Sequence, residues 1–191
     1  MTRRPRILFL AGESEGGRRS VVGRIHIYSC LVHADIILRR AGPSYFSGEQ
    51  GDFDDWSRWV SELENPQMHD RLYSAVLKSM VKLTREAIGG AVVVQGAIVG
   101  HPSFRVLMRD LLEREFSTHF RDADEALFWL DLPLPEVLDR AKVCNPNVTM
   151  IEIGQRVAQY ERLIVDQSFR RFDSISACVA AATSILLDES E

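Results

Sequence analysis

A short apolar run at residues 6–11, RILFLA, leads directly into the glycine-containing stretch GESEGGRRS. A continuous apolar run of this length is typical of a strand that is buried on both faces of a sheet. The glycines and small polar residues after it predict a tight turn, and we expect a helix over residues 20–32. The beginning of the chain therefore predicts a buried strand, a turn and a helix in direct succession.

Further strand-like and helix-like segments alternate along the rest of the chain. The clearest strand is AVVVQG at residues 91–96, because three consecutive valines favour a sheet that is buried on both faces. We expect the other strands at residues 34–39, 126–133 and 170–175, and helices at 66–88, 104–116, 135–142, 151–168 and 177–187. This alternation predicts an α/β fold, a three-layer doubly wound parallel sheet of about five strands with right-handed crossovers.

Length and composition narrow the class of protein. The chain of 191 residues fits one domain over residues 1–191, and its 46% of apolar residues excludes a disordered chain. The net charge of −4 argues against a protein that coats nucleic acid.

The cysteines, Cys30, Cys144 and Cys178, show no metal-ligand spacing, so we expect buried free thiols. The apolar run before Gly12 is too short for a signal-peptide core or a membrane span, so the expected location is the cytoplasm, with no membrane contact.

Gly12 and Gly17 have the spacing of the two glycines in the phosphate-binding pattern GxxxxGK(S/T). After the first strand of a parallel sheet, such a turn directs backbone N–H groups toward the ligand edge, which suits phosphate. Arg18 and Arg19 stand where the pattern has Lys and Ser or Thr, and an arginine can still donate to phosphate oxygens. If the turn holds one extra residue, Arg19 and Ser20 take these two roles instead. The alternative to a phosphate site is an ordinary strand-to-helix turn.

The residues predicted to contact nucleotide in this stretch are Gly12, Glu13, Gly16, Gly17, Arg18, Arg19 and Ser20. Ser20 is also the predicted magnesium ligand, since the hydroxyl of such a turn normally ligates the ion. Glu13 and Glu15 bring negative charge to the place of the polyphosphate, which opposes binding. The turn therefore lies where a phosphate site is expected, but its residues differ from those of the usual pattern.

The altered glycine turn, the strand VVVQG and above all the stretch FWLDLPLPEVLDRAK resemble the nucleoside and nucleotide kinase branch of P-loop proteins, over nearly the whole chain. The resemblance implies a kinase that uses ATP and Mg²⁺. It also implies a lid around residues 140–156, in which Arg140, Lys142 and Arg156 clamp phosphates, and a role for Asp131 near a strand end. The residues alone leave two alternatives open: exposed helix charges in the lid, and an aspartate at 131 that caps the next helix.

The chain departs from this family at the end of the valine strand. Gln95 stands where an acidic residue near magnesium is common, and an amide cannot act as a carboxylate base. Gly96 and Ala97 replace the expected Asp-Arg or Glu-Arg pair. These departures favour a second hypothesis, in which a P-loop fold without catalysis serves as a nucleotide-binding or interaction subunit.

Other residues are candidates for the acceptor side of a transfer reaction. His101 can act as a general base or recognise a nucleobase, although a loop histidine is more often structural. It completes the predicted catalytic set of Arg18, Arg19, Asp131 and His101. The long loop at residues 41–55, with its acidic residues and the aromatic residues up to 59, is the expected acceptor contact. We expect a small nucleoside or nucleotide acceptor. A modified base in DNA fits the same class but is less favoured by the acidic charge, and a homodimer is compatible with the sequence.

Overall fold

The computed structural model describes residues 6–12, 17–25, 30–34, 91–116, 123–163 and 168–187. The strands are β1 (Arg6–Gly12), β2 (Cys30–His33), β3 (Ala91–Gln95), β4 (Asp124–Leu130) and β5 (Arg170–Phe172). The helices are α1 (Arg18–Arg24), the short 3-10 helix η1 (Ile98–Gly100), α5 (Pro102–Phe116), α6 (Leu134–Cys144), α7 (Met150–Leu163) and α8 (Ile175–Leu187). The helix predicted at 66–88 and the loop at 41–55 lie outside the described residues. No helix within the described ranges is long and apolar enough to cross a lipid bilayer.

The five strands form one parallel sheet in the order β2-β3-β1-β4-β5. β1 is the central strand, and its Leu10 pairs with Gln95 of β3 on one side and with Phe128 of β4 on the other. Because all neighbours are parallel, the carboxyl ends of the five strands lie at the same edge of the sheet. This edge is where the polar residues that follow the strands come together.

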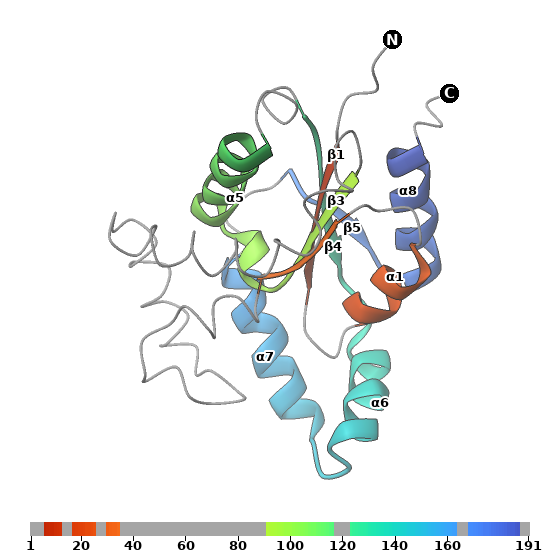
Figure 1. Cartoon of the computed structure of the whole chain (residues 1–191). Helices are drawn as coiled ribbons and strands as arrows, with labels where there is room; N and C mark the ends of the chain where they lie inside the picture. The colour runs from red at the N-terminus through yellow and green to blue at the C-terminus, as the bar shows by residue number, and fades with distance from the viewer. Residues whose placement is uncertain are drawn as a thin grey trace.

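Helices cover both faces of the sheet, with α5 on one face and α1 and α8 on the other (Figure 1). The side chains of β1 alternate between the two layers, as a pleated strand requires. Leu8 and Leu10 pack in one core cluster with inner residues of α1 and α8, whereas Ala11 packs with Trp129 and Phe169. The predicted three-layer α/β fold with a five-stranded parallel sheet is therefore confirmed.

The predicted boundaries are wrong in the second strand-and-helix unit. The helix predicted over residues 20–32 ends at Arg24, and residues 30–33 form β2 instead. Ala34, the predicted start of the second strand, follows β2, and residues 35–39 lie outside the described residues. Runs as short as CLVH fit a helix face and a buried strand equally well, so periodicity could not separate the two.

The thiols are only partly as predicted. Cys178 is buried in the core, and burial raises the pKa of its thiol to about 12. Cys144 is exposed at the end of α6, contrary to the prediction. Cys178 is therefore a core residue that stays protonated at neutral pH.

Candidate functional site

The glycine turn joins the carboxyl end of β1 to α1. Gly12 has φ +140° and Gly17 has φ +90°, both in the region that residues with a side chain rarely adopt. A Cβ on Gly12 would lie 2.7 Å from the carbonyl oxygen of Leu130, and one on Gly17 would lie 2.8 Å from Cδ1 of Ile175. Both positions therefore require glycine, for conformation and for space. Glu13 and Gly16, the other predicted contacts of this turn, lie outside the described residues.

The two arginines after Gly17 differ in their environment. α1 begins at Arg18, and the carbonyl of Gly17 accepts hydrogen bonds from the backbone N–H groups of Ser20 and Val21 at 2.8 and 3.0 Å. Arg18 is only 5% exposed, and its Cγ lies 3.6 Å from the position of a Cβ on Gly12. Arg19 is exposed and Ser20 is half-buried. Arg18 is thus the arginine that packs back along the turn.

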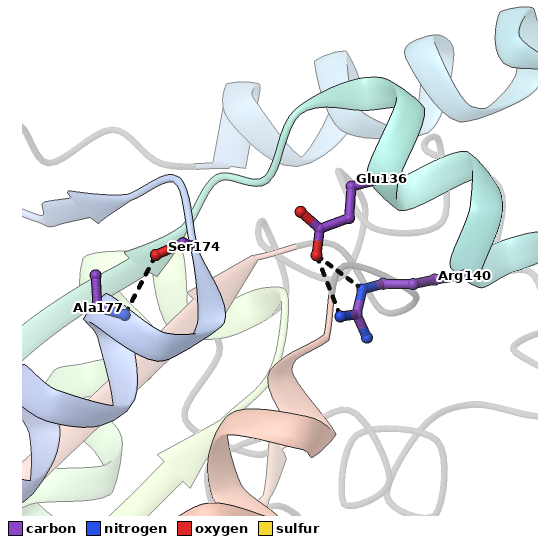
Figure 2. A network of polar contacts seen from close by, with 4 residues as sticks. All are labelled: Glu136, Arg140, Ser174 and Ala177. Atoms are coloured by element: carbon purple, nitrogen blue, oxygen red, sulfur yellow. Dashed lines mark hydrogen bonds and ion pairs between the residues drawn. The ribbon is translucent and has the colours of Figure 1, made fainter.

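A second arginine reaches the same turn from α6. The Cζ atom of Arg140 lies 3.6 Å from the position of a Cβ on Gly17. Its Nε and Nη2 donate hydrogen bonds to Oε1 of Glu136 at 3.3 and 3.1 Å. Figure 2 shows this pair opposite the first turn of α8, where the hydroxyl of Ser174 accepts a hydrogen bond from the backbone of Ala177 at 3.2 Å. The described structure therefore brings Gly12, Gly17, Arg18 and Arg140 together at one end of β1.

Asp131 follows β4 at the same edge of the sheet. Its backbone N–H donates to the carbonyl of Phe172 at 2.8 Å, and its Oδ2 lies 3.5 Å from Nη1 of Arg171. The guanidinium of Arg171 also lies over the ring of Trp129, 4.1 Å from the centroid. The alternative role as a helix cap is wrong, because α6 has Pro133 at its N-cap position and no side-chain cap.

A small, partly open pocket lies next to Asp131. Its lining comes from β4, the connection that follows it, α6 and α7, and consists of Trp129, Leu130, Asp131, Leu132, Val137, Val157 and Tyr160. The lining is mainly apolar, with a carboxylate and a phenol as its polar groups.

The predicted lid segment, residues 140–156, consists of the end of α6, a turn and the start of α7. α7 begins with a capping box, in which the N–H and Oγ1 of Thr149 donate to Oε2 of Glu152 at 2.7 and 2.9 Å. These bonds lower the pKa of Glu152. Arg156 is half-buried one turn further along α7. The Thr-x-x-Glu spacing was present in the sequence and could have placed this helix start one residue earlier.

A polar pair that sequence reasoning missed lies at the ends of β2 and β3. His33 pairs with Gln95 in the sheet, and Nε2 of Gln95 donates a hydrogen bond to Nδ1 of His33 at 2.6 Å. Gln95 is only 5% exposed, and His33 is half-buried. Since an amide nitrogen only donates, Nδ1 of His33 is the acceptor in this bond. The misplaced helix over residues 20–32 concealed His33, which otherwise could have been read as the residue that ends a strand.

His101 follows η1, beyond the carboxyl end of β3. Its backbone N–H donates to the carbonyl of Ile98 at 2.9 Å, and its side chain is half-buried. Arg105, one turn into α5, donates from Nη1 to the carbonyls of Val99 and Gly100, each at 3.1 Å. These bonds fix η1, and with it His101, at the ligand edge of the sheet.

The described residues include no group of three His, Cys, Asp or Glu side chains that could hold a metal ion by themselves. A magnesium ion that arrives with a nucleotide needs only one or two protein ligands, because phosphates and waters supply the rest. Ser20, in the first turn of α1, and Asp131, after β4, are oxygen donors of the type that Mg²⁺ prefers. These oxygen donors therefore fit an ion that arrives with a nucleotide.

Comparison with known proteins gives likeness of structure without likeness of sequence. No protein-family model matches the chain, and no curated protein matches it significantly. An uncharacterised protein from Eubacterium ventriosum matches with a TM-score of 0.51 and 9% identity, over 96% of this chain and 98% of that one. The tunicamycin resistance protein of Deinococcus radiodurans has a TM-score of 0.49 and 17% identity, over 98% and 96%. A gluconokinase from Sinorhizobium meliloti has a TM-score of 0.49 and 16% identity, over 99% of both chains.

At 9% identity, the likeness to the Eubacterium protein shows a shared fold and nothing about chemistry. The centre of this fold is a strand, a glycine turn and a helix, with glycines at 12 and 17 in the conformations that such a turn demands. A P-loop has the same order of strand, glycine turn and helix. The chain therefore has the parallel α/β fold that its sequence predicts, with a glycine turn after its central strand.

Proposed function

We propose that this chain is an ATP-dependent kinase that transfers a phosphoryl group to a nucleoside- or nucleotide-like acceptor. The observation that carries the proposal is the position of two guanidinium-bearing side chains beside one glycine turn. Arg18 packs beside Gly12, and Arg140 packs beside Gly17. Glycine leaves the backbone open to a close ligand, and arginine is the side chain best suited to phosphate oxygens. A phosphate chain is the ligand that would contact both the open backbone of the turn and the two arginines.

The proposal gives a role to three arginines. Arg18 stands in the lysine position and holds the phosphates of the donor. Arg140 stabilises the negative charge that develops on the transferred group, and Arg156 is the second lid residue proposed for this task. Arg19, being exposed, is not assigned to the phosphates. Charge stabilisation and positioning are what phosphoryl transfer mainly requires of a protein.

Mg²⁺ is proposed to bind together with ATP, through the hydroxyl of Ser20 and the carboxylate of Asp131. When bound, the ion neutralises charge on the phosphates. The side chain of Asp131 already lies 3.5 Å from Arg171, so it has to exchange this contact to serve the metal. Ser20 and Asp131 are both proposed ligands, and Ser20 lies one residue after the usual hydroxyl position when Arg18 takes the lysine role.

The acceptor is proposed to bind at the β2 and β3 side of the turn. His33 and Gln95 end these two strands, His101 follows η1, and all three carry hydrogen-bonding groups. Neutral donors and acceptors suit the hydroxyl of a sugar or the edge of a nucleobase. His101 is the proposed general base for the hydroxyl that is phosphorylated.

A second candidate function is a nucleotide-binding subunit without catalysis. Gln95 favours it, because its amide is bonded to His33 where a carboxylate near the metal is expected. In this case the turn binds nucleotide, and no acceptor is phosphorylated.

Calorimetry with ATP, in the presence and absence of Mg²⁺, tests the first half of the proposal. Release of ADP, measured across a panel of nucleosides and nucleoside monophosphates, tests the second half. We expect Mg²⁺-dependent ATP binding and ADP release that depends on one class of acceptor. Binding without acceptor-dependent release supports the subunit, and absence of ATP binding rejects both functions.

A further inference from the structure

Glu136 and Arg140 form an ion pair one turn apart on α6. Both hydrogen bonds of the pair end on the same oxygen, Oε1 of Glu136, and both start on one edge of the guanidinium, at Nε and Nη2. The side chains are 43% and 34% exposed. Pairs of this kind on helix surfaces contribute little to stability. The more important effect of the Glu136–Arg140 pair is on the position of the Arg140 side chain.

That position is against the glycine turn. The Cζ atom of Arg140 lies 3.6 Å from the place where a side chain at Gly17 would begin. A guanidinium group has five N–H donors, and the two bonds to Glu136 use the edge that contains Nε. The donors on Nη1 are not part of this pair, and the planar group holds them in a fixed direction once its other edge is bound.

We propose that Glu136 is a positioning residue, which holds Arg140 beside Gly17 so that its guanidinium meets the phosphate chain of a nucleoside triphosphate. The inference rests on the proposed function, because it requires that the turn binds nucleotide. A long arginine side chain loses rotamer freedom when it binds a ligand, and this loss weakens binding. Glu136 restricts Arg140 before the nucleotide arrives, so the loss on binding is smaller.

The negative charge of Glu136 also repels phosphate, so the two effects oppose each other. Water screens the carboxylate, because the side chain is 43% exposed. Orientation does not depend on the charge, since a neutral glutamine keeps an oxygen that accepts the same two hydrogen bonds. Removal of the side chain and removal of the charge alone therefore have different expected results.

A double-mutant cycle on ATP affinity tests the inference, with calorimetry on the full chain. Glu136→Ala is expected to weaken ATP binding roughly threefold to tenfold, the loss that goes with one newly immobilised side chain. Arg140→Ala is expected to weaken it at least as much. In the Arg140→Ala background, Glu136→Ala is expected to have no further effect, because its action passes through the arginine. Glu136→Gln is expected to restore most of the affinity.

Asp139→Asn is the matched control, since it removes the same charge from an exposed position of the same helix. It is expected to leave ATP affinity unchanged. Two results would overturn the inference: an unchanged or tighter affinity for Glu136→Ala, or an effect of equal size when Arg140 is absent. Failure of the unmodified chain to bind ATP would instead reject the proposed function itself. Thermal unfolding of each variant shows whether a loss of affinity comes from a loss of fold.

Discussion

Ile175, the first residue of α8, fills the space beside Gly17, and a Cβ on Gly17 would lie 2.8 Å from its Cδ1 atom. The end of the glycine turn is therefore in contact with a helix that begins more than 150 residues later in the sequence. This contact leaves no space for a side chain at position 17 and ties the turn to the core.

Gly17→Ala is expected to destabilise the fold by about 2 kcal/mol or more, because alanine at φ +90° is strained and its methyl group overlaps Ile175. The measurement is the free energy of unfolding in urea. Gly154→Ala on α7 is the control, since nothing lies within 4 Å of its Cβ position. The control is expected to gain about 0.5–1 kcal/mol, the helix propensity of alanine over glycine. Equal stability of the two variants would contradict the described turn.

Substitution of Arg18 is expected to weaken ATP binding much more than the same substitution of Arg19. Arg18→Gln should reduce ATP affinity by about tenfold or more, because a charged hydrogen bond to phosphate is lost. Arg19→Gln should change it by less than about twofold, since the side chain is exposed on the helix surface. Titration calorimetry with Mg²⁺-ATP gives both values. A larger loss for Arg19 would mean that the turn holds one extra residue, with Arg19 in the lysine role.

Arg105 should be important for stability. It is 6% exposed, and it donates to the carbonyls of Val99 and Gly100 while its guanidinium lies 5.0 Å from the centre of the Phe169 ring. Arg105→Leu leaves two buried acceptors without this donor, so we expect a loss of about 2–4 kcal/mol in denaturant unfolding. Arg114→Leu, on an exposed position of the same helix, is the control and should be nearly neutral.

Glu152 should contribute a pH-dependent part of the stability. Its hydrogen bonds from Thr149 lower its pKa in the folded chain below the ordinary value of 4.5. A carboxyl group with a lowered pKa stabilises the fold above the unfolded pKa, and this contribution disappears as the pH falls through the folded pKa. Wild type should therefore be more stable than Glu152→Gln at pH 7, and the difference should shrink below about pH 4.5. A difference that stays constant down to pH 2 would show that the charge is not involved.

The parts of the fold that could be predicted are those in which local pattern and tertiary environment agree. The valines of β3 and the apolar run of β1 are buried on both faces, so hydrophobicity alone was enough. β2 could not be predicted, because CLVH is a strand only by virtue of its pairing with β3. The candidate site was predictable to the same extent. The spacing of Gly12 and Gly17 could be recognised in the sequence. The approach of Arg140 to Gly17 and the bond between His33 and Gln95 could not, because they depend on how distant strands and helices pack.

The central position of β1 has a consequence for the way the chain acquires its structure. Arg6 pairs with Ala91 and with Asp124, so both described neighbours of the first strand are synthesised long after it. Contacts between such distant segments form slowly, because long stretches of chain have to be ordered before they are made. Until β3 and β4 have been synthesised, the apolar side chains and backbone groups of β1 lack these partners. Exposed apolar surface and unpaired strands favour aggregation. We therefore expect the sheet to form only after β3 and β4 have been synthesised.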